Sequence, residues 1–298
     1  MREVRNPSLS AITTLGLGGT CSLELTVSSR DDLAAMDDRI RELGLPVYVV
    51  GRGSNIFGLD GSHEAVLVRP AFTDGPAVLE DETADGGVLV SCGAGISLPV
   101  LLAFLREKGL SGMEGLAGIP GTVGGAVAMN AGSFGTSTAE SLDSVEIWSG
   151  GRLVRLTPDA CETGYRHFRP RGLAGSFLVV SAVFRLSRST SQDVAAGMQH
   201  NFQMKKSRQP ITARSAGCVF RNPACGVSAG ALLERAGFRG RRKGSVALSE
   251  QHANFLVNLG GGTSAEALAL LEEARTAVRA MAGVELDFEV RFLPCLSS

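Results

Sequence analysis

The stretch GMEGLAGIPGTVGGAVAMNAGSFG, residues 112–135, constrains the fold more than any other part of the chain. Glycine occurs at positions 112, 115, 118, 121 and 124, and this three-residue period breaks at Gly125. A collagen helix is excluded because it needs many prolines between its glycines, and only Pro120 is present. A flexible linker is excluded because apolar residues fill the intervening positions. The stretch should therefore be buried.

Buried backbone with so few side chains must find partners for its N–H and C=O groups. The residues alone leave two explanations open: tight packing of loop on loop, or a flat ligand whose polar edge supplies the partners. The segment GIPGTVGGAVAMNAG contains no titratable side chain, so it would act through backbone amides and shape. Such a composition suits holding a cofactor better than it suits acid–base chemistry.

The bulk composition predicts a multidomain cytoplasmic protein. A chain of 298 residues is long enough for two or three packed units. Its 29 basic and 30 acidic side chains give no general attraction for nucleic acid or an anionic membrane. No apolar run approaches a membrane span, and the start, MREVRNPSLS, lacks the apolar segment of a signal peptide. The six cysteines form no CxxC pair, so we expect thiols and no metal site.

Hydrophobic patterns predict an α+β protein with irregularly interleaved strands and helices. Thr157 before Pro158 is expected to cap a helix, and a domain boundary is expected near residues 190–210. The predicted strands are 21–29, 46–51, 64–70, 86–93, a hairpin over 145–156 that turns on Gly150 and Gly151, and 176–187; the predicted helices are 30–45, 97–108 and 190–210.

The last hundred residues should form a separate arrangement. A short helix is expected over 230–237, two strands within 244–258, and a final strand over 284–293. A long helix should begin at the capping pattern of Thr263 and Glu266. The core face of that helix is predicted to contain Ala267, Leu270, Leu271, Ala274, Ala277, Val278 and Met281.

Several residues could carry chemistry. The turn GRGSN, residues 51–55, follows a strand, and its small residues could form an anion-binding nest, although such turns are also common connections. Glu289 interrupts an apolar strand, where a carboxylate needs a partner or a task. The other candidates, each with an ordinary structural explanation beside the functional one, are Tyr165, Arg166, Lys205, Lys206, Cys218 and His252.

Together these stretches resemble one family, the UDP-N-acetylenolpyruvoylglucosamine reductases of bacterial peptidoglycan synthesis. The resemblance covers nearly the whole chain and follows the order of the family's motifs. GIPGTVGGAVAMNAG followed by SAGCVFRNP is highly specific, whereas GRGSN alone would not be. The matching stretches are TTLGLGG, VGRGSN, GLAGIPGTVGGAVAMNAGSFG, GYRHF, RQPITARSAGCVFRNP, AGALLERAGFRG, HANFLVN and LDFEVRFL.

The resemblance implies two FAD-binding subdomains of the vanillyl-alcohol oxidase type and a C-terminal α+β substrate domain. The expected boundaries are 1–69, 70–198 and 199–298, with the last strand returning toward the active site. Gly51, Arg52, Gly53, Ser54 and Asn55 would meet the FAD pyrophosphate. The flavin would be lined by Ile119, Pro120, Gly121, Gly124, Gly125, Val127, Asn130, Ala131 and Gly132.

The resemblance also implies the reaction. NADPH would reduce FAD, and a hydride would then pass to C3 of UDP-N-acetylglucosamine enolpyruvate, giving UDP-N-acetylmuramate after protonation at C2. Arg166 would grip the substrate carboxylate, because a guanidinium binds a carboxylate in two places. Glu289, if protonated, could donate a hydrogen bond to the enolate. The family often has serine as the proton donor to C2, whereas this chain has Cys218.

Further positions follow from the same resemblance. Tyr165, Lys205, Lys206, Asn222 and His252 would contact the substrate, and the sequence does not separate the two lysines. The only other tyrosine is Tyr48, so the substrate domain should belong to the shorter subtype, which lacks a tyrosine-bearing loop. The protein is expected to be a monomer. Two alternatives stay open: an FAD-dependent oxidase of the wider superfamily, and a flavin- or nucleotide-binding protein without catalysis.

The cysteine at position 218 should make the enzyme sensitive to thiol reagents. A thiol, with an ordinary pKa of about 8.5, is mostly protonated at neutral pH and releases its proton more readily than an alcohol. Iodoacetamide should therefore inactivate the protein, and Cys218→Ser should protect it while retaining activity. Equal inactivation of both proteins would assign the sensitivity to another group.

Overall fold

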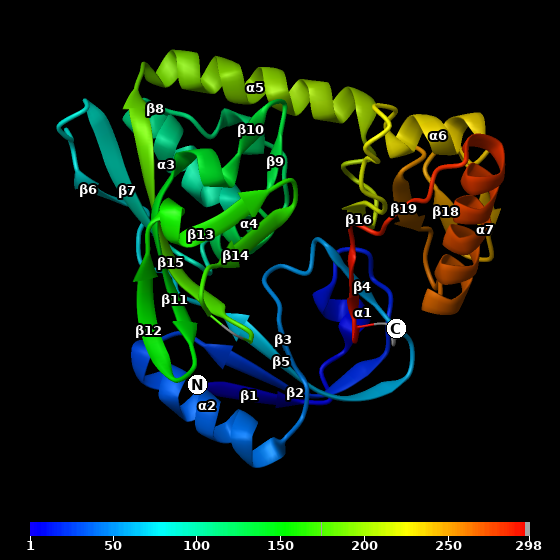
Figure 1. The fold of residues 1–298 in the computed structure, drawn as a ribbon, viewed down its shortest axis with the longest axis horizontal. Coiled ribbons are helices and arrows are strands. Elements are labelled where there is room, and N and C mark those ends of the chain that lie inside the picture. The colour runs from blue at the N-terminus through cyan, green and yellow to red at the C-terminus, as the bar shows by residue number, and fades with distance from the viewer. Residues whose placement is uncertain (174, 296–298) are drawn as a thin grey trace. The chain divides into compact units, whose positions relative to one another are not determined.

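A computed structural model describes residues 1–173 and 175–295 (Figure 1). The mixture of strands and helices confirms the α+β class. The chain divides into two compact units. Unit 1 comprises Met1–Glu3, Leu25–Gly51 and Leu67–Met204, and unit 2 comprises Val4–Glu24, Arg52–Val66 and the described chain from Lys205 onward.

The helices are α1 (Leu9–Ile12), α2 (Arg30–Leu43), α3 (Leu98–Lys108), α4 (Val123–Ala128), α5 (Ser191–Arg208), α6 (Ala229–Arg235) and α7 (Ser264–Ala282), with 3-10 turns η1 (Glu114–Leu116), η2 (Thr138–Ser141) and η3 (Pro158–Ala160). The strands are β1 (Arg2–Arg5), β2 (Thr20–Val27), β3 (Val47–Val49), β4 (Ile56–Gly58), β5 (Ser62–Pro70), β6 (Ala77–Glu80), β7 (Gly87–Gly93), β8 (Leu110–Ser111), β9 (Gly132–Ser133), β10 (Thr136–Ser137), β11 (Leu142–Ser149), β12 (Arg152–Leu156), β13 (Cys161–Gly164), β14 (His167–Pro170), β15 (Leu178–Arg188), β16 (Ser215–Cys218), β17 (Arg242–Lys243), β18 (Val246–Leu248), β19 (Phe255–Asn258) and β20 (Arg291–Leu293).

Unit 1 is built on a six-stranded sheet with the order β12-β11-β15-β7-β6, to which β8 adds at one end of β15. The long apolar run of β15 is central, and it pairs antiparallel with both β7 and β11. Burial over most of Leu178–Phe184 explains the apolar first part of this strand, whereas the polar residues follow where the strand becomes exposed at Arg185. The core forms where the apolar faces of α3 and α4 meet these strands.

Helix α2 shows how local sequence signals set its ends. Ser29 and Asp32 form a capping box at its start, and Gly44 ends it with φ 63°. The indole N–H of Trp148 on β11 donates to Asp37 on the helix at 2.9 Å. This bond ties α2 to the sheet of unit 1.

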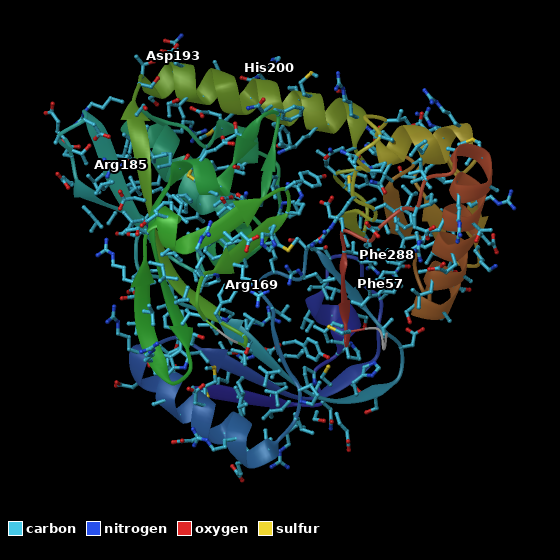
Figure 2. All side chains as sticks on the ribbon, in the orientation of Figure 1. Phe57, Arg169, Arg185, Asp193, His200 and Phe288 are labelled. Atoms are coloured by element: carbon cyan, nitrogen blue, oxygen red, sulfur yellow. The ribbon has the colours of Figure 1, made fainter. Side chains whose placement is uncertain are left out.

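Unit 2 contains an antiparallel sheet with the order β16-β19-β18-β17, together with α6 and α7. β20 pairs parallel with β4. Phe292 packs against both Phe57 and Phe288, with ring centroids 4.9 Å apart in each case. Figure 2 labels Phe57 and Phe288. Phe288 also stacks on Phe220 at 5.1 Å. This row of rings anchors the C-terminal segment in the core of unit 2.

Asn258 explains the position of the N-terminal motif TTLGLGG within unit 2. Its side-chain amide donates to the carbonyl oxygens of Leu15 and Gly16 at 3.1 and 3.0 Å. Its side-chain oxygen accepts from the N–H groups of Gly260 and Gly262 at 3.0 and 3.2 Å. One buried amide thus connects the turn that follows β19 to an N-terminal segment that is distant in sequence.

Three local expectations are wrong. Only Arg291–Leu293 of the expected final strand is a strand, because Phe288 instead forms an isolated bridge to Phe220. Met281 is 46% exposed, since the last turn of α7 extends beyond the core. The Thr157 hydroxyl bonds to the Asp159 side chain and not to a backbone N–H, and only a short 3-10 turn follows.

Candidate functional site

Cys218 and Glu289 lie on neighbouring backbone segments of unit 2. The Glu289 N–H donates to the carbonyl oxygen of Val219 at 2.7 Å, and Phe220 forms an antiparallel bridge with Phe288. Glu289 is buried, with 7% of its surface exposed, and Cys218 is half-buried. The structure thus brings together two of the three residues that the sequence predicts for catalysis.

The last residue of GRGSN belongs to the same part of unit 2. The Asn55 carbonyl oxygen accepts from the Arg291 N–H at 3.0 Å. The Asn55 side-chain amide donates to the Glu289 carbonyl oxygen at 3.2 Å. A predicted cofactor residue and a predicted catalytic residue therefore hold each other in place.

Asn254 is a residue of this site that the sequence analysis missed. Its side chain accepts from the Phe220 N–H at 2.9 Å and donates to the Phe220 carbonyl oxygen at 2.8 Å. Its own carbonyl oxygen accepts from the Val219 N–H at 2.8 Å. These bonds fix the backbone directly after Cys218. The available signal was an asparagine beside an apolar strand, since a buried amide needs partners.

His252 is held as a neutral ring. Its Nδ1 accepts from the Asn254 N–H at 3.2 Å, and the ring packs on Phe255 with centroids 4.9 Å apart. Burial lowers the pKa of His252 below its ordinary value. With Nδ1 as acceptor, the ring proton is assigned to Nε2, which can donate to a ligand. Gly230 makes room for the ring, because an added Cβ would lie 2.9 Å from its Cε1.

The two lysines that the sequence does not distinguish differ in their burial in the structure. Lys205 is buried, with 3% exposed, whereas Lys206 is exposed. The Gln251 side chain donates to the Lys206 carbonyl oxygen at 2.8 Å. Asn222 is exposed, and its side-chain oxygen accepts from the Ala229 N–H at the start of α6, at 3.1 Å. A ligand bound by Asn222 would therefore meet its amide nitrogen.

In unit 1 the Gly-rich stretch contains the short helix α4, which the sequence analysis did not expect. The Thr122 hydroxyl accepts from the Gly125 N–H at 3.3 Å and caps the helix. The side chain of Val127 lies in the core. Of the residues predicted to line the flavin, Val127 could therefore do so only through its backbone.

Two neighbouring glycines of this stretch have different surroundings. A Cβ added at Gly124 would lie 2.8 Å from the Cβ of Ala94, so packing requires glycine there. Outside its chain neighbours and the backbone of its own helix, a Cβ added at Gly125 would have one described neighbour within 4 Å, the Thr122 hydroxyl at 3.4 Å. Gly125 is half-buried. Packing thus explains Gly124 and does not explain Gly125.

The turn GRGSN is shared by the two units, with Gly51 in unit 1 and the rest in unit 2. In unit 1 the Arg69 guanidinium donates to the Gly51 carbonyl oxygen at 3.1 Å. A Cβ added at Gly51 would lie 2.8 Å from the Thr122 hydroxyl. In unit 2 Gly53 has φ 69° and is buried. Arg69 and Thr122 are further residues of this region that the sequence analysis missed.

Arg166 lies at the turn of a hairpin in unit 1. Gly164 pairs with His167, so Tyr165 and Arg166 form a two-residue turn between β13 and β14. Arg166 has φ 55°, and its guanidinium carbon lies 5.0 Å from the centroid of the Tyr165 ring. In Figure 2 the hairpin can be found by the label of Arg169, which lies on β14. Two predicted site residues are thus presented by one turn.

The predicted catalytic residues are distributed over both units: Arg166 belongs to unit 1, and Cys218 and Glu289 belong to unit 2. Among the described residues, no group of three or more His, Cys, Asp or Glu side chains is placed to hold a metal ion. Within the same part of the chain, no helix has the length and apolar character of a membrane span.

The six cysteines, all described, are thiols rather than disulfides. Burial raises the pKa of Cys21 to about 11 and that of Cys92 to about 12, and it also raises the pKa of Cys161. These three buried thiols are therefore poor nucleophiles. Cys225 and Cys295 are exposed.

Two family models match the chain. The model of an FAD binding domain matches residues 22–157, and the model of the UDP-N-acetylenolpyruvoylglucosamine reductase C-terminal domain matches residues 209–293. The UDP-N-acetylenolpyruvoylglucosamine reductase of Oleidesulfovibrio alaskensis is 48% identical over 292 residues, which cover 97% of each chain. That of Nitratidesulfovibrio vulgaris is 47% identical over 297 residues, which cover 99% of this chain and 100% of the relative.

A solved structure agrees with these relatives. The crystal structure of UDP-N-acetylenolpyruvylglucosamine reductase from Thermus caldophilus superposes with a TM-score of 0.79 and 32% identity, covering 98% of each chain. The chain therefore belongs to the UDP-N-acetylenolpyruvoylglucosamine reductases and is an FAD-binding oxidoreductase of that family.

Proposed function

We propose that this chain uses NADPH and FAD to reduce the enolpyruvyl group of UDP-N-acetylglucosamine enolpyruvate to UDP-N-acetylmuramate for peptidoglycan synthesis. The observation that carries the proposal is the placement of the Cys218 thiol and the buried Glu289 carboxyl group on backbone segments joined through Val219. Reduction of a C=C bond needs a proton as well as a hydride, and both groups can carry one. Membership of the reductase family supports the same reaction.

The residues of unit 1 fit a bound FAD. Packing against other described residues does not require glycine at position 125, and small residues let backbone approach a flat ring closely. Gly51 of unit 1 is assigned to the pyrophosphate together with Arg52, Gly53, Ser54 and Asn55 of unit 2. When bound, FAD would accept a hydride from NADPH and supply one to C3 of the substrate. The flavin is assigned to Ile119, Pro120, Gly121, Gly124, Gly125, Val127, Asn130, Ala131 and Gly132.

Arg166 and Glu289 are assigned to the charge that develops on the substrate. As C3 gains a hydride, the electron pair of the C=C bond moves toward C2 and the carboxylate, which gives an enolate-like species. The Arg166 guanidinium can grip that carboxylate with two parallel hydrogen bonds. Its contact with the Tyr165 ring restricts its direction. The carboxylic acid form of Glu289 would donate a further hydrogen bond to the enolate oxygen.

Cys218 is assigned to protonate C2. Its S–H bond breaks as the C2–H bond forms, and the resulting thiolate regains a proton from solvent. The reaction thus consumes the substrate, NADPH and one proton, and it yields the reduced sugar nucleotide and NADP⁺. Asn254 supports this step indirectly, because it fixes the backbone of Val219 and Phe220 next to the thiol.

The remaining assignments concern the sugar nucleotide. Tyr165, Lys205, Lys206, Asn222 and His252 are assigned to substrate binding. The neutral ring of His252 would donate from Nε2. Lys206, being exposed, can follow a flexible diphosphate, whereas Lys205 would offer a fixed charge.

We extend the proposal to the organisation and setting of the protein. The proposed division is an FAD-binding subdomain over 1–69, a second over 70–198 and a substrate domain over 199–298. The protein would act as a monomer in the cytoplasm, where NADPH and nucleotide-linked sugars are available.

Anaerobic spectroscopy tests the proposed function. The purified protein should show a flavin absorption spectrum that one equivalent of NADPH bleaches. One equivalent of the enolpyruvyl substrate should then restore the colour and yield UDP-N-acetylmuramate. A reduced flavin that oxygen recolours but the enolpyruvyl substrate does not would indicate an oxidase. A flavin that NADPH does not bleach would indicate a binding protein. Either result would contradict the proposal.

Substitution of the two neighbouring glycines should separate cofactor binding from folding. Gly125→Leu places a bulky side chain where the flavin is assigned, and its Cβ would approach the Thr122 hydroxyl only to 3.4 Å, so FAD affinity should fall about 100-fold or more while the melting temperature of the apoprotein stays within a few degrees of wild type. Gly124→Leu overfills the contact with Ala94 and should destabilise the apoprotein by about 1–3 kcal/mol. Calorimetry and FAD titration measure both quantities. If both variants destabilise the apoprotein equally, packing also explains the glycine at position 125, and the prediction is contradicted.

A further inference from the structure

Asn130 has a local conformation that few residues adopt. It follows α4 by two positions, has φ 40°, and its N–H donates to the Val127 carbonyl oxygen at 3.0 Å. Asparagine is among the few residues other than glycine that tolerate this left-handed region. The side chain is buried, with 7% exposed. A buried side-chain amide must form its hydrogen bonds either within the protein or with a ligand.

Both ends of the Asn130 side chain bond within unit 1. The amide nitrogen donates to the Gly164 carbonyl oxygen at 2.9 Å. The amide oxygen accepts from the Ala139 N–H at 2.9 Å. The neighbouring backbone is held from the same side, because the Thr138 hydroxyl and N–H donate to the Ala131 carbonyl oxygen at 2.7 and 2.9 Å.

The Gly164 carbonyl is a sensitive point of the hairpin. Gly164 is the last residue of β13, and the turn residues Tyr165 and Arg166 follow it directly. Arg166 itself has φ 55°, an uncommon conformation that surrounding structure must maintain. The base of the hairpin has other supports, since Phe168 lies in the core and the Arg171 N–H donates to the Ala160 carbonyl oxygen at 2.8 Å.

We infer that Asn130 is a positioning residue that ties the turn bearing Arg166 to the end of α4. The inference rests on the proposed role of Arg166 and adds a second residue, which acts through Arg166. Arg166 would contact the substrate carboxylate, whereas the side chain of Asn130 would fix the position of the turn and thereby the position of the Arg166 guanidinium. The end of the proposed flavin loop and the substrate-binding turn thereby share one side-chain amide.

Asn130→Gly is the informative variant. Glycine keeps the left-handed backbone at no steric cost and removes only the side chain. Asn6→Gly is the matched control, because Asn6 is exposed and has φ 49°. Asn130→Asp is a second variant: it keeps an acceptor for Ala139 but has no donor for Gly164, so it should behave like Asn130→Gly.

The first readout needs no cofactor. In the apoprotein, hydrogen exchange of the hairpin amides Tyr165–Phe168 should be about tenfold faster in Asn130→Gly than in wild type or Asn6→Gly. Exchange in α7, which lies in unit 2, should not change. Unchanged exchange of the hairpin would overturn the inference, and so would a uniform increase across unit 1, which would mean general destabilisation.

The second readout separates positioning from folding. Recolouring of the reduced holoenzyme by the enolpyruvyl substrate should slow roughly 10- to 100-fold in Asn130→Gly, which is more than any slowing of bleaching by NADPH, since Asn130 is also assigned to the flavin site. In an Arg166→Ala background, the same change should slow recolouring no further. Equal slowing of both half-reactions, or additive effects in the double variant, would overturn the inference. If wild type itself is not recoloured, the proposed function fails, and the exchange experiment still decides whether Asn130 holds the turn.

Discussion

Buried backbone with little side-chain cover has to satisfy its own polar groups, and residues 112–135 are organised by that requirement. Part of the stretch does so by forming α4, which Thr122 caps. At the far end, Asn130 and Thr138 supply the bonds that a regular helix would have supplied. The apolar residues between the glycines hold the backbone in the core of unit 1, whereas packing against other described residues does not explain the glycine at position 125.

Around Cys218 and Glu289, unit 2 meets the same requirement with the side-chain amides of Asn254 and Asn55. Asn254 bonds both polar groups of Phe220, and Asn55 bonds the backbone of Glu289. The aromatic row through Phe288 and Phe292 adds apolar packing to these directed bonds. The backbone around Cys218 and Glu289 is consequently fixed from several sides, which is what positioning of proton-bearing groups requires.

The sequence predicted most of the regular elements because their signals are local. β7, β15, α2, α3, α5 and the start of α7 follow from hydrophobic period and capping residues. Residues 284–290 were predicted wrongly as strand because their apolar side chains pack in the core of unit 2 without a strand ladder, whereas Arg291–Leu293 does pair with β4. Whether packing requires a glycine, as it does at Gly124 against Ala94, depends on neighbours distant in sequence. The same holds for Asn254 and the side chain of Asn130, whose partners are up to 34 positions away.

Hydrogen exchange of the apoprotein with and without saturating FAD tests the central claim, that the side-chain-poor backbone is a ligand surface. The account predicts that FAD slows exchange selectively in residues 51–55 and 119–132, and that α7, whose buried face lies in the core of unit 2, exchanges as before. If exchange in both segments is the same with and without bound FAD, the central claim is contradicted. The glycines would then serve only the packing of the protein itself.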